Sequence, residues 1–107
     1  MNLQFEPISV EKQSDYFELL ARCPQVASDY SFMNLWAWAD EYGLDWAWEE
    51  NCVWIRQTRP ETLFWAPVGS WKEIDWRTRF DLDRNIRTAI IRVPEILAES
   101  WRKTFGD

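Results

Sequence analysis

The chain has 107 residues and a formal net charge of −6, from 18 acidic and 12 basic side chains. Its Lys and Arg residues are scattered, whereas a nucleic-acid surface needs a basic patch that neutralises phosphates, so we expect no nucleic-acid binding. No apolar run reaches the about 18 residues of a membrane span, and the first residues carry no signal-peptide pattern, so we expect a cytoplasmic protein.

The first part of the chain predicts a short strand and a helix. Residues 4–8 are interpreted as the strand and residues 10–22 as the helix, which ends before Pro24 because proline cannot continue a helix. One face of this helix gathers apolar side chains that we expect to be buried, namely Val10, Phe17, Leu20 and Ala21, with Tyr16 at the margin.

Residues 32–42 predict a second helix, around which the rest of the chain is organised. Ser31 precedes it as a candidate N-cap, and Gly43 follows it at the left-handed closing position that favours glycine. Four apolar residues recur at the spacing i, i+3, i+4 and i+7, which predicts one buried face: Phe32, Leu35, Trp36 and Ala39.

Trp38 lies away from that face on the helical wheel. Its neighbours on the outer side are Asn34 and Glu41, and Met33 flanks them. A large aromatic side chain with a polar rim on a solvent-facing helix is typical of an interface. We therefore predict that Met33, Asn34, Trp38 and Glu41 contact a partner, and that the isolated chain self-associates weakly through this surface.

Three short strands follow, at residues 44–49, 52–58 and 63–66. In the first, large apolar residues alternate with polar or small ones, which is the period of a half-buried strand. The links between the strands are short, and Pro67 ends the third strand. We therefore predict an antiparallel meander.

The last third of the chain predicts a helix, a strand and a helix. Residues 70–73 match a capping box, and a helix over residues 71–82 would pair Trp76 with Phe80. A strand at residues 88–92 follows the third strand through this crossover, so the two strands should be parallel. The C-terminal residues then predict the last helix.

These elements give the order β-α-α-β-β-β-α-β-α in a single domain, residues 1–107. The predicted fold class is α+β, with a mostly antiparallel mixed sheet and helices on its faces. This element order resembles the GNAT (acyl-CoA N-acyltransferase-like) fold.

Four segments also resemble an uncharacterised bacterial family that is related to the C-terminal domain of phosphatidylglycerol lysyltransferase. They are Ser-Asp-Tyr-Ser-Phe-Met-Asn-Leu-Trp-Ala-Trp (28–38), Tyr-Gly-Leu-Asp-Trp-Ala (42–47), Phe-Trp-Ala-Pro-Val-Gly (64–69) and Ile-Arg-Val-Pro-Glu (91–95). Proteins of this family carry two GNAT-like domains in tandem. The resemblance therefore implies that this chain is the first domain, the N-terminal half of a longer protein.

For the full-length protein, the resemblance implies acyl or aminoacyl transfer from a CoA-type or aminoacyl donor. Such a reaction would depend on the second half of the protein. This chain would then be a non-catalytic domain without a cofactor of its own. Its role would be to wall one side of the substrate cleft and to pack against the second GNAT-like domain.

The loop that binds CoA in active GNAT enzymes has a counterpart here that departs from the family pattern. That pattern, Gln/Arg-x-x-Gly-x-Gly/Ala before a helix, presents backbone N–H groups to the pyrophosphate. The corresponding residues 65–71 have one glycine, Gly69, and Pro67 has no N–H to offer. We therefore expect no CoA binding, with Gly69 and Ser70 as the candidate cofactor-binding pair and a simple turn and helix cap as the competing interpretation.

Two other functions stay open: a free-standing interaction module that uses the Trp38 surface, and a small self-sufficient acetyltransferase with an unusual CoA loop. Because the chain has no histidine, Cys23 and Cys52 have no Cys-His pairing and are interpreted as core residues. Three acidic pairs are interpreted as solvated faces, namely Asp40 with Glu41, Glu49 with Glu50, and Asp81 with Asp83. We therefore predict no catalytic residue and no metal site.

Overall fold

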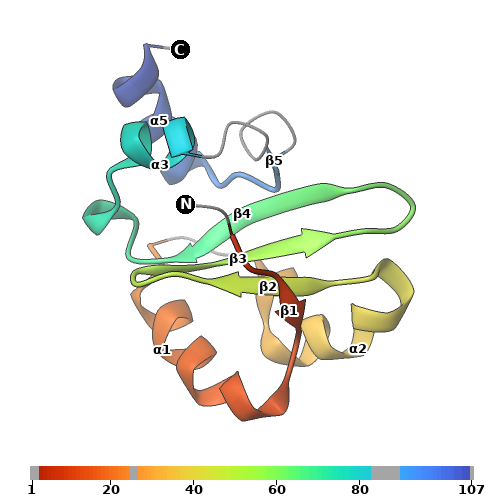
Figure 1. Ribbon diagram of the computed structural model, residues 1–107. Coiled ribbons are helices and arrows are strands. Elements are labelled where there is room, and N and C mark those ends of the chain that lie inside the picture. Colours follow the sequence, from red (N-terminus) through yellow and green to blue (C-terminus); the bar gives the residue numbers. More distant parts are fainter. Residues whose placement is uncertain (1–2, 25–26, 83–89, 107) are drawn as a thin grey trace.

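The computed structural model describes residues 3–24, 27–82 and 90–106, and Figure 1 shows their arrangement. The helices and strands, in chain order, are β1 (Glu6–Pro7), α1 (Gln13–Arg22), α2 (Phe32–Tyr42), β2 (Asp45–Trp48), β3 (Cys52–Gln57), β4 (Leu63–Gly69), α3 (Trp76–Leu82), β5 (Ile90–Ile91) and α5 (Glu95–Phe105). Short 3-10 turns precede three of the helices: η1 (Val10–Lys12), η2 (Ser28–Tyr30) and η3 (Trp71–Glu73).

The strands form one five-stranded mixed sheet in the order β1-β2-β3-β4-β5. The first four strands pair antiparallel, which confirms the predicted meander. β5 pairs with β4 in parallel, with Phe64 opposite Ile90. The α+β class and the mixed sheet with helices are therefore confirmed, although part of the predicted strand 88–92, like Asp83, lies outside the described residues.

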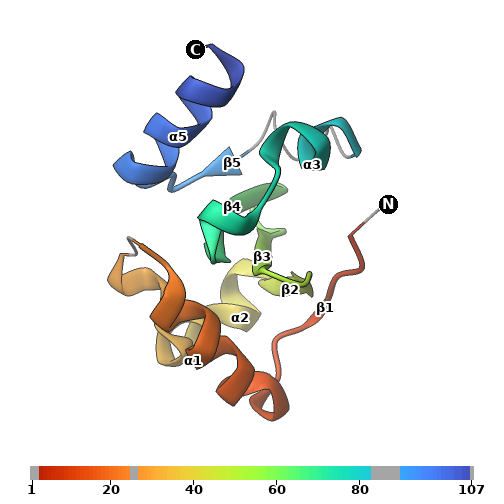
Figure 2. The ribbon, with the colours of Figure 1, turned by 90° about the vertical axis from the view of Figure 1, so that its left-hand side faces the viewer.

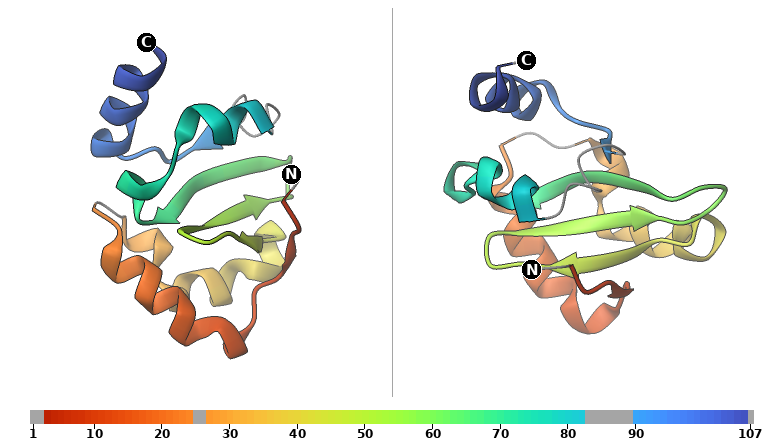
Figure 3. Two further views of the ribbon diagram at one scale, coloured as in Figure 1. Left: turned by 60° about the vertical axis from the view of Figure 1, so that its left-hand side comes forward. Right: turned by 45° about the horizontal axis from the view of Figure 1, so that its top comes forward.

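The helices cover the sheet from both sides. In Figure 2 and Figure 3, α1 and α2 lie on one face, whereas α3 and α5 lie on the other. Each face has its own apolar core, and successive residues of a strand enter opposite cores. Trp46 points into the α1/α2 core and Ala47 into the α3/α5 core, and both are fully buried. The expectation of a half-buried strand is therefore wrong, because the α3/α5 layer covers the second face.

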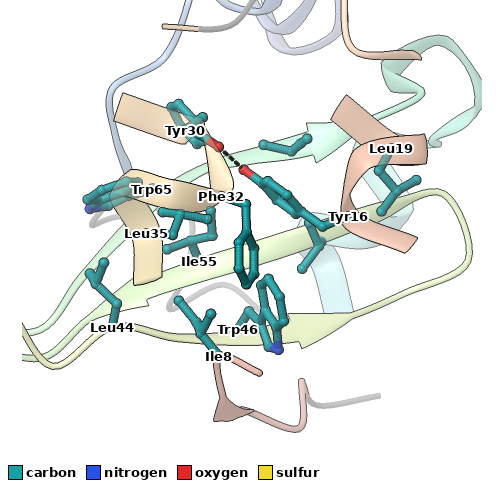
Figure 4. Packing of buried hydrophobic residues seen from close by; sticks show 12 residues of the cluster. Ile8, Tyr16, Leu19, Tyr30, Phe32, Leu35, Leu44, Trp46, Ile55 and Trp65 are labelled. Atoms are coloured by element: carbon teal, nitrogen blue, oxygen red, sulfur yellow. Dashed lines mark hydrogen bonds between the residues drawn. The ribbon is translucent and has the colours of Figure 1, made fainter. Parts of the chain in front are cut away.

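Aromatic rings fill the core between the sheet and the α1/α2 layer (Figure 4). The Tyr16 and Trp46 ring centroids lie 5.7 Å apart, and those of Phe32 and Trp46 lie 6.2 Å apart. The Tyr16 hydroxyl donates to the carbonyl of Tyr30, and the Tyr30 hydroxyl donates to the carbonyl of Ala66 at 3.0 Å. Burial raises the pKa of both tyrosines far above the usual value, so both hydroxyls stay protonated donors.

The ends of α2 follow the predicted local rules. The Ser31 hydroxyl accepts from the backbone N–H of Asn34 at 3.2 Å, which confirms the N-cap. Gly43 closes the helix with a φ of 58°, a left-handed conformation that favours glycine. A Cβ atom at Gly43 would also lie 2.0 Å from the Thr58 hydroxyl oxygen, so the position excludes a side chain for a second reason.

The predicted buried faces of the first two helices are partly wrong. Tyr16 and Leu19 carry the buried face of α1, whereas Val10 and Phe17 are 51% and 50% exposed. The helix begins as the 3-10 turn η1, which has about three residues per turn and therefore shifts the phase of the apolar face. In α2, Phe32 and Leu35 are buried as predicted.

Trp36 is the correction in α2, because it is 48% exposed. Its ring stacks on that of Phe32, with centroids 6.0 Å apart and an interplanar angle of 17°. The helix is rotated so that Phe32 and Leu35 meet the sheet, which leaves Trp36 at the outer margin of the apolar face. Trp36 covers the core from outside instead of filling it.

Two predictions for the second half of the chain are also wrong: that Pro67 ends the third strand, and that residues 70–73 form a capping box. β4 continues past Pro67 to Gly69, because a register irregularity opposite β3 places the proline where the ladder needs no N–H donor. Ser70 makes no side-chain cap, and α3 begins only at Trp76. Asp75 caps α3 instead, since its carboxylate accepts from the N–H of Thr78 at 3.3 Å and from the Thr78 hydroxyl at 2.9 Å. The predicted pairing of Trp76 with Phe80 is confirmed at 5.8 Å.

The two adjacent residues Leu35 and Trp36 give a test of how α2 is oriented. Leu35→Ala should lower the free energy of unfolding by about 3 kcal/mol, because it opens a cavity in a closed core. Trp36→Ala should cost only about 1 kcal/mol, the order of one lost aromatic pair. Urea unfolding of the two variants beside the unchanged chain measures both values, and equal losses would show that Trp36 is part of the core.

Candidate functional site

The outer surface of α2 exposes three large apolar side chains (Met33, Trp36 and Trp38), which we call the α2 surface. Their exposed fractions are 75%, 48% and 37%, respectively. Successive helical residues are about 100° apart, so the two tryptophans lie on opposite flanks of the helix with Met33 between them. The structure therefore shows Trp38 exposed, as predicted. Trp36, for which the sequence predicts burial, adds a second exposed aromatic side chain.

The predicted interface residues on this helix differ in the contacts that their side chains already make within the domain. The Trp38 ring packs on that of Tyr42, with centroids 6.1 Å apart at 82°. The Asn34 amide donates to the carbonyl of Ser28 at 2.9 Å, so it already serves the turn before α2. Glu41 has an exposed side chain, and its backbone carbonyl accepts from Arg59 at 3.2 Å. Whether these residues contact a partner stays a prediction.

Gly69 and Ser70 serve the packing of the turn between β2 and β3. Gly69 has a φ of 155°, and a Cβ atom there would lie 2.1 Å from the carbonyl oxygen of Asn51. The N–H of Ser70 donates to this same carbonyl at 2.9 Å. The backbone group that a phosphate would need is therefore already used within the domain.

The rest of the segment that corresponds to the CoA loop is also occupied. The carbonyl of Ala66 accepts from the Tyr30 hydroxyl, and the carbonyl of Pro67 accepts from the indole N–H of Trp71 at 2.9 Å. The small hollow that Tyr30, Ala66 and Pro94 line leaves no space that a water-sized molecule could enter. Side chains of the domain thus fill this end of β4.

The sequence reasoning missed an ion pair between α3 and the end of β2. Arg79 is only 8% exposed, and its Nε lies 3.0 Å and 2.9 Å from the two carboxylate oxygens of Glu49. The indole N–H of Trp54 donates to the same carboxylate at 2.9 Å. The Glu49 carboxylate therefore links α3 to the central strands and is not the solvated acid that we expected at this turn.

The guanidinium of Arg79 is incompletely paired. Its two terminal amino groups, Nη1 and Nη2, are buried and have no hydrogen-bond partner in the structure. The charged group lies over the ring of Trp54, 5.7 Å from the centroid. Buried N–H donors without an acceptor cost stability, and the indole N–H groups of Trp46, Trp48, Trp76 and Trp101 likewise have no protein acceptor.

Arg79 and Glu49 line a cavity of about 460 Å³ between the β2–β3 turn and the start of α3. Two further acids, Glu50 and Asp75, belong to the same wall. Trp48 and Ile74 contribute apolar surface. Small-molecule sites commonly have about 300–1,000 Å³, mostly apolar walls and a few convergent polar groups, and this cavity has that character.

One signal in the sequence could have revealed this site. Arg79 follows Trp76 by three positions and precedes Phe80, so it falls on the apolar face of α3 and not on the solvated one. A charged residue on an apolar helical face requires a buried counter-charge. Its identity, Glu49, lies 30 residues earlier, and no local pattern connects the two.

The described residues contain neither a candidate membrane span nor a candidate metal cluster. In that part of the chain, no helix combines the length and apolar character that crossing a membrane requires. The same residues contain no cluster of three or more Cys, Asp or Glu side chains that could hold a metal ion.

Comparisons with known proteins identify a solved structure with a similar fold. No model of a known protein family matches the chain, and no curated protein matches its sequence. A crystal structure of a conserved protein of unknown function from Bacteroides thetaiotaomicron VPI-5482 superposes with a TM-score of 0.78 at 14% sequence identity. The match covers 99% of this chain and 37% of that one, so the chain spans little more than a third of its structural neighbour.

The Glu49 carboxylate offers a test of the ion pair. Glu49→Gln should lower the free energy of unfolding by about 3 kcal/mol, because it leaves the guanidinium of Arg79 buried without a counter-charge. The neighbouring Glu50→Gln is the matched control, and as a surface change it should stay within about 0.5 kcal/mol. Denaturant unfolding at neutral pH measures both variants, and similar values for the two would refute the buried pair.

Proposed function

We propose that this chain is a non-catalytic GNAT-like domain of a transferase-related protein. It packs against a second GNAT-like domain of the same protein and forms one wall of that protein's substrate cleft. The observation that carries the proposal is the α2 surface, where Met33, Trp36 and Trp38 expose large apolar side chains on one helix.

The sheet supports the GNAT-like part of the proposal, and the structural neighbour supports the part that places this fold within a longer protein. An antiparallel meander followed by a helical crossover into a parallel strand is the arrangement that the resemblance implies. The same fold occurs as about a third of a longer chain in the Bacteroides protein, where the match covers 37% of the residues. A domain of this kind within a longer protein needs a surface for its neighbour.

The filled end of β4 supports the non-catalytic part. The N–H of Ser70, a donor that a pyrophosphate would need, already donates to the carbonyl of Asn51, and Tyr30 and Trp71 are hydrogen-bonded to Ala66 and Pro67 of the same segment. Donor binding and chemistry are therefore assigned to the other domain. This geometry also argues against a self-sufficient acetyltransferase with an unusual CoA loop.

The character of the α2 surface defines the expected partner. Domain interfaces within a chain typically bury about 600–1,500 Å² and combine an apolar centre with a polar rim. At 100° per residue, Asp40 falls between Trp36 and Met33, and Glu41 falls between Met33 and Trp38, so exposed acids alternate with the three apolar side chains. The partner surface should therefore combine apolar side chains with basic residues that face these acids.

The coding sequence beyond codon 107 gives the first test. The proposal expects it to continue into a second GNAT-like domain with its own Gly-rich loop. That domain, expressed separately, should bind the 107-residue chain in calorimetric titration. A stop codon directly after Asp107 would overturn the two-domain proposal and would leave the free-standing interaction module as the function of the α2 surface.

Substitutions on α2 test whether this surface makes the contact. Trp38→Ser should weaken binding of the second domain roughly 30-fold, because truncating a central aromatic side chain typically costs about 2 kcal/mol. The matched control is Ile96→Ser, which alters an apolar residue that is 51% exposed on the opposite layer. Equal affinities for the two variants, with unchanged melting temperatures, would rule out the α2 surface as the interface.

The non-catalytic assignment predicts the outcome of an acetyl-CoA titration. The isolated chain should show no saturable binding below the millimolar range, which corresponds to about −4 kcal/mol. The reason is that the N–H of Ser70 already donates to Asn51 and that Pro67 has no N–H, so neither residue can donate to a pyrophosphate. Calorimetric binding at micromolar concentration, displaced by CoA, would contradict the assignment.

A further inference from the structure

A second cavity lies beside Trp36, at one flank of the α2 surface. Its volume is about 320 Å³, and residues of β1, of α2 and of the adjoining segments line it: Pro7, Ile8, Trp36, Ala39, Asp40 and Leu44. All of these except Asp40 are apolar, so Asp40 is the one charged residue that the structure places in this wall. An apolar cavity with one acid suits a side chain that has an apolar stem and a positive end.

Trp36 and Asp40 are neighbours on the same face of α2, because side chains four residues apart on a helix have Cβ atoms about 5–6 Å apart. Phe32 stacks on one side of the Trp36 ring, and about half of Trp36 remains exposed. Asp40 is also exposed, and its carboxylate forms no ion pair among the residues that the structure describes. The helix therefore presents an aromatic ring and an unpaired acid side by side at the cavity.

Other aromatic rings of the domain show what such a pair of side chains can bind. Four cations of the described chain each lie over an aromatic ring and also form an ion pair with an acid. These trios are Arg92 with Trp65 and Asp29, Arg56 with Phe5 and Asp45, Arg79 with Trp54 and Glu49, and Lys12 with Trp48 and Glu6. Trp36 and Asp40 supply the ring and the acid of a further trio, for which the described residues supply no cation.

Arginine fits this position better than lysine does. In three of the four trios the cation is an arginine, with its guanidinium carbon 4.2 Å, 4.5 Å or 5.7 Å from the ring centroid. A planar guanidinium can stack on an indole and also donate two parallel hydrogen bonds to one carboxylate. Its methylene stem can pack on apolar walls such as those of Ile8 and Leu44.

We propose that this cavity receives an arginine side chain of the second GNAT-like domain. The guanidinium stacks on Trp36 and pairs with Asp40, and the methylene stem packs on the apolar wall. The inference rests on the proposed function, since the second domain supplies the arginine. It adds the chemistry of one contact at the α2 surface, which apolar exposure alone does not define.

The first experiment needs only the 107-residue chain, labelled with nitrogen-15, and three blocked amino acids as probes. N-acetyl-arginine methylamide should shift the indole N–H signal of Trp36, which the Trp36→Phe variant assigns, with saturation in the millimolar range. The corresponding citrulline derivative has nearly the same shape without the charge. It should bind at least about fivefold more weakly, because it loses both the cation–π contact and the ion pair. The lysine derivative should also bind more weakly than the arginine derivative.

A substitution of the acid locates the binding. Asp40→Asn should weaken binding of the arginine probe at least about threefold and leave binding of the citrulline probe unchanged. Asp15→Asn is the matched control, because Asp15 is an exposed acid of α1 outside the cavity wall. This variant should bind both probes as the unchanged chain does.

The second domain then shows whether it supplies the arginine. Each of its arginines is replaced by alanine, and one replacement should weaken docking at least about tenfold and lose this effect in the Asp40→Asn background, since the two groups act as a pair.

Equal affinities of the arginine and citrulline probes, an unchanged affinity of Asp40→Asn for the arginine probe, or a second domain that docks without any arginine coupled to Asp40 would each overturn the inference. In the last case the proposed function would stand, because docking itself is observed. A second domain that does not dock at all would refute the proposed function and with it the source of the arginine, whatever the probes show.

Discussion

Helices cover both faces of the sheet, and this double cover determines which core each strand residue enters. Along β3, Val53 and Ile55 enter the core between the sheet and the α1/α2 layer. Cys52 and Trp54 enter the core between the sheet and the α3/α5 layer. Because side chains alternate along a strand, a slip of one residue would exchange the contents of the two cores. Two apolar faces require two helical layers, and the chain supplies one before the meander and one after it.

Because helices cover both faces of the sheet, buried polar side chains need hydrogen-bond partners within the domain. The tyrosines have such partners, since the Tyr16 hydroxyl donates to Tyr30 and the Tyr30 hydroxyl donates to Ala66. Glu49 likewise accepts from Trp54 and pairs with Arg79. The terminal amino groups of Arg79 and the indole N–H groups of Trp46, Trp48, Trp76 and Trp101 have no protein acceptor.

The two candidate sites belong to different layers of the fold. The α2 surface consists of apolar side chains that lie outside the core, on the outer side of a helix that covers one face of the sheet. The Arg79 cavity arises where α3 meets the β2–β3 turn on the other face. The α2 surface and the Arg79 cavity therefore lie on opposite faces of the sheet.

Features that depend on neighbouring residues can be predicted from the sequence. Ser31 and Gly43 set the ends of α2, and the period-2 strands gave the meander, because capping and side-chain alternation are local. Tertiary packing fixes how α2 is rotated on the sheet, so Trp36 is exposed although its spacing equals that of a buried residue. It also decided the site, since Arg79 meets Glu49 across 30 residues and no local pattern records such a contact.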